Sequence, residues 1–394
     1  MSLRIWPASI GATFVLLTIL PLACFGQIDP YQRNLVQLGY DQPIQGQGPQ
    51  GIYAYYYYNN PGIAGTNIAL RLAIAPVYVD GELGFRQLLS PYTDLGIGLY
   101  GGAYGDNYYE VRQGNYRRAE SFDGHGGGTS LSIYQLVNPG MLIPLNAVAR
   151  AGFRYSTFSR TSDTSDDFEL PDGRPMPFTR LGMRLGGKQP VLYPDLGMEA
   201  SAWFERYWRL NDGAYGFNRD RRMNERSDLY WAYAGLDYSW TNVGHKISFA
   251  TTAGNSGQPD RFSAWRLGGV LPLIAEFPLI LPGYYYQELT AKRFVHMSAG
   301  YLFPLDPQYR FKFRIEAATA LIEALPGFEQ LDPWQTGVGC GLTFTPKNNI
   351  CRIVLRYGYG FNAIRDNGDK GANSIGVLFQ YDFEQHKKWR HRDD

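Results

Sequence analysis

From residue 51 onward the sequence repeats one pattern, in which about ten residues of alternating character are followed by a turn. The segment 228–241, DLYWAYAGLDYSWT, shows this most clearly, because Tyr230, Leu236 and Trp240 share one face whereas Asp237 lies on the other. The first face is apolar in its middle and aromatic at both ends. This pattern is typical of a tilted strand that crosses an apolar layer of about 25 Å flanked by aromatic girdles.

Other segments place charged side chains on one face and apolar side chains on the opposite face. In the segment 309–319, Lys312, Arg314 and Glu316 share a face that opposes phenylalanine and isoleucine. The segment 350–357 repeats this arrangement. A soluble β-sandwich also alternates, but it has no need of aromatic residues at the ends of successive strands. The sequence therefore predicts an all-β fold, a transmembrane antiparallel outer-membrane β-barrel with a polar lumen and a lipid-facing exterior.

The tyrosine-rich stretch GIYAYYYYNN, residues 51–60, fits the same interpretation. Its even-numbered residues from 52 to 58 are expected to face lipid, with Tyr56 and Tyr58 at the level of the headgroups, and its odd-numbered tyrosines are expected to line the lumen. Tyrosine suits both faces, because its ring is apolar and its hydroxyl can meet water. The alternative interpretation is an exposed edge strand.

The connections alternate between long polar loops and short turns, which is typical of extracellular loops and periplasmic turns. We expect about fourteen strands, and an even number places both chain ends on the periplasmic side. Sixteen result if the segment 254–290 adds a hairpin. The expected strands lie near residues 51–58, 66–78, 93–104, 128–137, 145–158, 178–187, 195–208, 228–240, 245–253, 291–303, 309–320, 334–345, 349–360 and 372–383.

The ends of the chain differ in character from this repeat. Residues 1–26 carry one arginine, an apolar run and small residues, which predicts a secretory signal peptide. Residues 27–50 are expected to form a periplasmic N-terminal segment, residues 51–383 the barrel and residues 384–394 a basic tail. The formal net charge of +1 gives no global basic field, so no nucleic-acid partner is expected.

Several motifs in the last two-fifths of the chain follow one another in a recognisable order. They are DRFSAWRLGG at 260–269, LPGY at 281–284, SAGYLFPL at 298–305 and FRIEAA at 313–318. Together they resemble the barrel of the Omp85 superfamily, the bacterial surface antigen or D15 domain. The resemblance assigns a motif like that of the family's sixth extracellular loop to Arg266, Gly268, Gly269, Pro282, Gly283 and Tyr284. It also assigns the lumen acid of the family to Glu316.

The sequence departs from the family pattern at the loop tip. In the family an arginine at the tip enters the lumen and pairs with the strand acid, but here that position is Pro282. Glu316 is therefore expected to lack this partner unless Arg266 or another lumen arginine substitutes. The apolar insert at 270–281 is expected to fold inward or to pack on the rim, and residues 27–50 are too few for a periplasmic POTRA domain.

The last predicted strand resembles the signal by which barrel assembly machinery recognises a client barrel. Its residues are Ser374, Gly376, Phe379, Tyr381 and Phe383. The resemblances imply protein insertion or translocation at the bacterial outer membrane. The expected partners are outer-membrane lipids, the barrel assembly machinery, and client proteins or a periplasmic partner that supplies recruitment. A passive channel or a purely structural barrel is the alternative function.

An enzymatic interpretation rests on the run HMSAG at 296–300, which is similar to the active-site strand of outer-membrane phospholipase A. Alternation turns His296 and Ser298 toward the lumen, whereas a lipase that acts on the bilayer needs them outside. The five histidines show no metal-ligand spacing. We therefore expect no enzyme, no cofactor and no metal.

Overall fold

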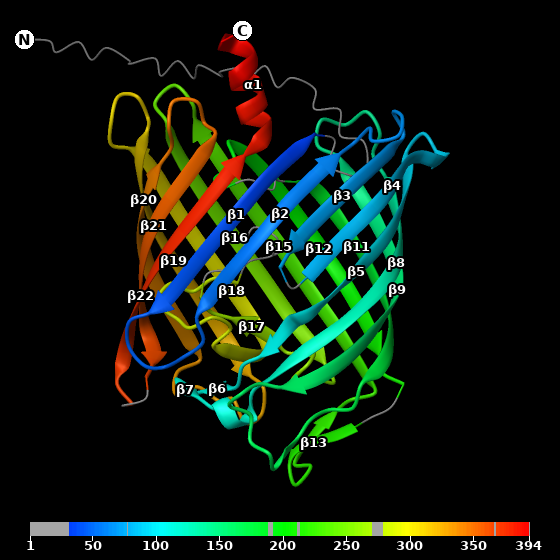
Figure 1. The fold of residues 1–394 in the computed structure, drawn as a ribbon, viewed down its shortest axis with the longest axis vertical. Helices are drawn as coiled ribbons and strands as arrows, with labels where there is room; N and C mark the ends of the chain where they lie inside the picture. The colour runs from blue at the N-terminus through cyan, green and yellow to red at the C-terminus, as the bar shows by residue number, and fades with distance from the viewer. Residues whose placement is uncertain are drawn as a thin grey trace, which may run out of the picture.

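The computed structural model describes residues 31–76, 78–187, 192–210, 213–269, 279–365 and 368–393. Within these ranges the chain forms a closed antiparallel barrel of 16 strands (Figure 1). The barrel strands are β1 (Arg33–Pro43), β2 (Gly51–Asn60), β3 (Ile68–Ala75), β4 (Tyr78–Ser90), β5 (Thr93–Tyr108), β8 (Phe122–Leu136), β9 (Leu145–Arg160), β11 (Arg174–Gly187), β12 (Leu196–Trp208), β15 (Arg226–Trp240), β16 (His245–Gly257), β18 (Leu289–Pro304), β19 (Phe311–Ala324), β20 (Trp334–Phe344), β21 (Cys351–Ile364) and β22 (Lys370–Asp382).

Two of these strands differ from the expectation of fourteen. Strand β1 lies inside the segment 27–50, which was expected to be periplasmic, so the barrel begins at Arg33 rather than at residue 51. Its alternation of Val36, Leu38 and Tyr40 against polar and small residues makes it a wall strand. Strand β4 covers residues for which the sequence predicts no strand of their own, between the expected strands 66–78 and 93–104. It joins β3 through a hairpin in which Ala75 pairs with Tyr78, and this hairpin is far tighter than the other connections at that end. Within its described residues, the segment 254–290 adds only the short strand β17 (Trp265–Leu267) between β16 and β18 and no wall hairpin.

The barrel closes where the first strand meets the last. Strands β1 and β22 pair in one continuous antiparallel register from Leu35 opposite Asp382 to Pro43 opposite Ser374. The amide of Ile44 extends this ladder with a 2.8 Å bond to the carbonyl of Asn373. Strand β1 therefore begins, and β22 ends, at the same end of the barrel.

A single helix, α1 (Phe383–Asp393), follows β22, so the expected basic tail is helical in the part that the structure describes. It stands at the end of the barrel that carries the short turns (Figure 1). Its first residue, Phe383, packs edge-on against the rings of Tyr56 and Tyr381. Among the described residues, no helix is long and apolar enough to cross a membrane.

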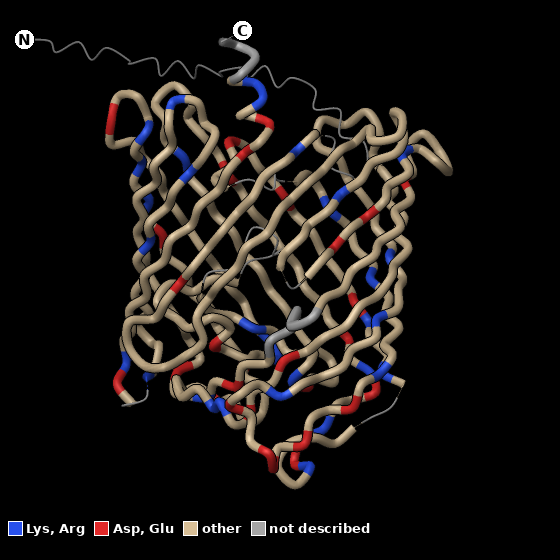
Figure 2. The backbone as a smooth tube through the Cα atoms, viewed as in Figure 1, with Lys and Arg blue, Asp and Glu red and all other residues tan. Residues whose placement is uncertain are grey.

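The alternation predicted from the sequence is confirmed on the wall. Tyr230, Leu236 and Trp240 are exposed on the outside of β15, whereas Trp231 and Tyr233 are buried toward the lumen. Charged residues gather mainly at the end of the barrel that carries the long loops (Figure 2). The apolar exterior and polar interior are those of a barrel that faces lipid.

The long loops form a small cap over one end of the barrel. It contains the pair β6 (Val111–Arg112) and β7 (Asn115–Tyr116), the 3-10 helix η1 (Arg118–Glu120), and a sheet of β10 (Phe168–Glu169), β13 (Gly213–Phe217) and β14 (Arg221–Met223). An aromatic cluster around Phe122, Phe168 and Tyr215 holds these pieces together. A buried pair, Arg209 and Asp260 at 2.8 Å, ties two loops to each other.

Candidate functional site

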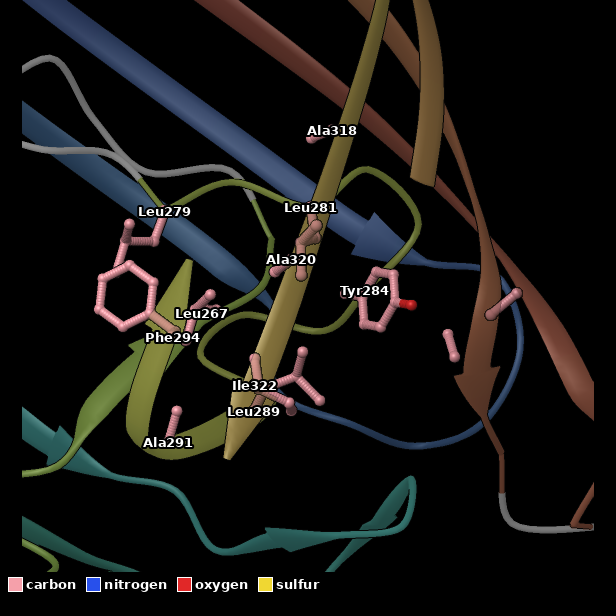
Figure 3. Close-up of a cluster of buried hydrophobic side chains, with 12 residues drawn as sticks. Leu267, Leu279, Leu281, Tyr284, Leu289, Ala291, Phe294, Ala318, Ala320 and Ile322 are labelled. Carbon is pink, nitrogen blue, oxygen red and sulfur yellow. The ribbon is translucent and has the colours of Figure 1, made fainter. Parts of the chain in front are cut away.

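The described residues between β16 and β18, 258–269 and 279–288, fold into the barrel and are called the inward loop here. Its short strand β17 (Trp265–Leu267) pairs with β18. Leu267, Leu281 and Tyr284 of this loop pack against the lumen side of the wall, on residues of β18, β19, β21 and β22 (Figure 3). Residues 270–278 of the predicted apolar insert lie outside the described residues, but Leu279 and Leu281 are buried in this cluster.

The tip of the inward loop rests on glycines of the wall. A Cβ at Gly337 of β20 would lie 2.2 Å from the carbonyl oxygen of Pro282, and one at Gly360 of β21 would lie 2.7 Å from the Tyr284 ring. Gly283 itself has a φ of +86° and leaves no room for a side chain, because a Cβ there would meet the Gly360 amide nitrogen at 2.0 Å. The wall glycines therefore form a flat floor that the backbone of the tip can approach.

A buried ion pair fixes the loop behind its tip. Arg365, in the connection between β21 and β22, donates to Glu288 at 2.9 Å and to the carbonyl of Gly283 at 2.8 Å. Its guanidinium also lies 3.8 Å from the centroid of the Tyr285 ring. Glu288 in turn accepts a 2.7 Å bond from the Tyr285 amide. The sequence motif did not indicate Arg365, because it lies some 80 residues away along the chain.

The remaining residues of the predicted loop motif lie in the same loop. Arg266 donates to Gln287 at 2.6 Å and lies 4.6 Å from the centroid of the Tyr108 ring. Burial, together with the neighbouring Arg261, lowers the pKa of Arg266 to about 10. The amides of Gly268 and Gly269 donate to the carbonyls of Leu279 and Tyr285, so both glycines fasten the start of the loop to its end.

Glu316 projects from β19 into the lumen and has two arginine partners. Arg314 donates to it at 2.9 Å, and Arg356 of β21 donates to its other carboxylate oxygen. The described contacts of Glu316 thus include lumen arginines of the wall rather than Arg266 or the loop tip. A Cβ at Gly339 would lie 3.2 Å from this carboxylate, so Glu316 occupies the same wall as the loop tip, one step further from the long loops.

The turn between β11 and β12 reaches into the lumen from the other end. Leu192 packs against Val354 and Leu378, and Arg352 donates a 2.5 Å bond to the Leu192 carbonyl. Lys246 donates a 2.7 Å hydrogen bond to the carbonyl of Tyr193. The centroid of the Tyr193 ring lies 5.0 Å from the guanidinium carbon of Arg314. The sequence predicts only an ordinary short turn for this segment. Its only signal was a pair of apolar residues where a solvated turn would carry polar ones.

His296 and Ser298 face the lumen, as alternation predicts. The ring of His296 is buried, and its Nε2 donates to the carbonyl of Ile280 in the inward loop at 2.9 Å. This side chain therefore helps to hold the loop on β18.

The residues of the predicted C-terminal signal all belong to the closing region of the barrel. Ser374, Gly376, Phe379 and Tyr381 lie on β22, and Phe383 begins α1. In the ladder between β22 and β1, Ser374 pairs with Pro43 near one end and Tyr381 pairs with Val36 near the other. Alternation puts Phe379 and Tyr381 on the lipid side of β22, and Phe383 packs against Tyr381 and Tyr56.

Three solved structures are similar to this chain in fold. CdiB from Acinetobacter baumannii superimposes with a TM-score of 0.56 and 12% identity, over 89% of this chain and 60% of that one. BamA from Haemophilus ducreyi lacking POTRA domains 1–3 gives 0.53 and 11%, over 88% and 70%. CdiB from Escherichia coli gives 0.53 and 12%, over 89% and 63%. This chain therefore has the same fold as the CdiB and BamA barrels.

This chain spans 60% of the length of the first of these structures. No protein-family model matches the sequence, and no curated protein matches it. The likeness therefore concerns the fold. It agrees with the resemblance read from the motifs at 260–269, 281–284 and 313–318.

Proposed function

We propose that this protein is an integral barrel of the bacterial outer membrane that assists the insertion or translocation of polypeptides. In the orientation that we propose for the barrel in the membrane, the long loops are extracellular and the short turns are periplasmic. A separate partner supplies recruitment of the client chain, and the C-terminal residues of β22 direct the barrel to the assembly machinery.

One observation carries the proposal: the lumen is occupied along the wall of β18 to β22. The inward loop rests on Gly337 and Gly358 from one end, and the turn carrying Tyr193 reaches Arg314 from the other. Both segments are fixed by charged groups, through Arg365 and Lys246. A passive solute channel needs a free aqueous path, whereas a barrel that acts on polypeptides through its wall does not.

The assignment to polypeptide clients is supported by the shared fold. The barrels whose fold this chain shares include BamA and CdiB. The protein carries no grouping of His, Cys, Asp or Glu that could hold a metal ion within the described ranges. We propose no catalytic chemistry for it.

The test is an insertion assay with the full-length protein in phospholipid vesicles. An unfolded outer-membrane barrel protein is added, and its folding is followed by the mobility of the folded band in gel electrophoresis without heating. We expect faster folding than in vesicles that carry no protein or carry an unrelated porin. Equal rates in all three vesicle preparations contradict the proposal, and a steady ionic current together with equal rates favours the channel.

A further inference from the structure

The hydrogen-bonded wall is interrupted between β2 and β5. Strand β3 pairs with β2 only from Tyr56 to Asn60, because the β3–β4 hairpin turns back at Ala75 and Tyr78. Strand β4 pairs with β5 no further than Val79 opposite Gly101. Toward the long loops, residues 51–55 of β2 pair with β1 alone, and residues 102 and 106–108 of β5 pair with β8 alone, among the pairings of the described strands. This interruption is called the window here.

The window lies in the part of the wall that faces lipid. Ile52, on the edge of β2 that borders the window, is 71% exposed. Ile74 and Val79, which pair with each other next to the tip of the β3–β4 hairpin, are exposed too. Figure 1 shows the β3–β4 hairpin ending well short of the level that β2 and β5 reach. In hydrocarbon, backbone groups on an open strand edge have no water to bond, so such an edge is costly unless another strand covers it.

The window is framed on its remaining side by the inward loop. The Tyr286 amide donates to the carbonyl of Pro49, just before β2, and the Tyr286 ring packs against Tyr109, just after β5. The β5 side is also rich in glycine, since Gly101 and Gly102 pair with Gly127 and Gly126 of β8. The β5–β8 register then shifts between Gly102 and Asp106. Glycines and a register shift weaken a strand locally, so this border can move without breaking the barrel.

We propose that the window is a docking site for a β-hairpin of a partner polypeptide, which completes the wall by pairing with the edges of β2 and β5. The proposal rests on the proposed function and specifies the form of the client. An extended backbone offers alternating donors and acceptors to both edges, whereas a lipid chain offers none.

The number of strands follows from their direction. Strands β2 and β5 are antiparallel to each other, because the two antiparallel strands β3 and β4 separate them. An inserted single strand would be antiparallel to one edge and parallel to the other. Two antiparallel strands satisfy both edges, and two is also the number of strands, β3 and β4, that separate β2 from β5 where the wall is complete.

The test places a photo-reactive amino acid, benzoylphenylalanine, in the full-length protein in phospholipid vesicles. It replaces Ile52 in one variant and, as the matched control, Leu38 in another, because Leu38 is also lipid-facing but lies on β1, which is paired on both sides. The probes are a synthetic hairpin of two alternating strands joined by Asn-Gly, and one of its strands alone. Both variants must keep the heat-modifiable mobility of a folded barrel.

We expect the hairpin to crosslink several-fold more at position 52 than at position 38, and the single strand to crosslink equally at both. Hydrogen exchange of the backbone amides at 51–55 should slow when the hairpin is added, and that of 36–40 should not. Equal hairpin yields at both positions, or crosslinks at position 52 only to lipid or to a second copy, overturn the proposal.

The two proposals can fail separately. If the hairpin crosslinks at position 52 while the vesicles do not accelerate folding of an added barrel, the window stands and the proposed function fails. If folding is accelerated while crosslinking is equal at positions 52 and 38, the function stands and the window is not the docking site.

Discussion

Glu288 and Arg365 form a buried ion pair, 2.9 Å from Oε1 to Nη1, that joins the end of the inward loop to the connection between β21 and β22. Their side chains are 2% and 3% exposed. The pair holds Gly283 and Tyr285 as well, so one arginine positions the loop tip on the wall. Arg365 is not among the residues that the resemblance to the family assigns to the loop motif.

Replacing Arg365 with methionine should release the inward loop. The change leaves the Glu288 carboxylate buried without its partner, which costs about 3–5 kcal/mol of folding free energy. The midpoint of thermal unfolding in detergent, read from the heat-modifiable band, should fall. The control is Arg118→Ala, because Arg118 pairs with Asp163 at the surface with exposures of 48% and 50%, where a pair contributes about 0–1 kcal/mol. Equal midpoints for the two variants would show that the buried pair does not hold the loop.

The glycine floor predicts a steric effect. In Gly337→Ala the new Cβ would lie 2.2 Å from the Pro282 carbonyl oxygen, so the tip must move away from β20. We expect protease cleavage in the inward loop of this variant and no cleavage there in the wild type. Gly257→Ala is the control, because its nearest atom would lie at an ordinary 3.4 Å. A protected loop in Gly337→Ala would mean that the tip does not rest on this floor.

The contacts of Glu316 predict the outcome of placing an arginine at the loop tip. In Pro282→Arg a third guanidinium would approach a carboxylate that Arg314 and Arg356 already share, so we expect a lower thermal midpoint rather than a gain. Glu316→Gln should also lower the thermal midpoint, because the half-buried Arg314 and Arg356 would lose their counter-charge. If Pro282→Arg raises the midpoint instead, the lumen arginines have not replaced the loop arginine.

The cap predicts a pH dependence centred on Glu110, which lies beyond the end of β5. Burial raises the pKa of Glu110, but the charges of Arg261, Arg221 and Arg112 outweigh it and hold the pKa below its ordinary value. A lowered pKa stabilises the fold above the unfolded value of about 4.3 and loses that contribution as the pH falls through the folded value. The midpoint difference between wild type and Glu110→Gln should therefore be full at neutral pH and shrink in acid. A difference that is constant with pH would exclude this network.

The sequence predicted the parts of the fold that alternation controls. The faces of β15, β19 and β21 follow directly from period two, and so does the lumen side of His296. Strand β4 was missed because its connection to β3 breaks the rule of long loops at that end. Strand β1 was missed although it alternates, because it was assigned to a segment before the barrel.

The candidate site was only partly predictable. The loop motif and Glu316 were found because their residue types stand in a recognisable order. The partners Arg356 and Arg365 were not, because Arg356 lies on β21 and Arg365 in the connection that follows it, far along the chain from the residues that they bind. The window could not be foreseen either, since it exists only as the difference between the lengths of neighbouring strands.

The most direct test of the account is the electrical conductance of the full-length protein in a planar bilayer. An occupied lumen predicts no steady current from the wild type, and an open conductance in Arg365→Met, where the inward loop is released. A steady current in the wild type that Arg365→Met does not change would contradict the account, because ions would then be passing through a lumen that the loop does not close.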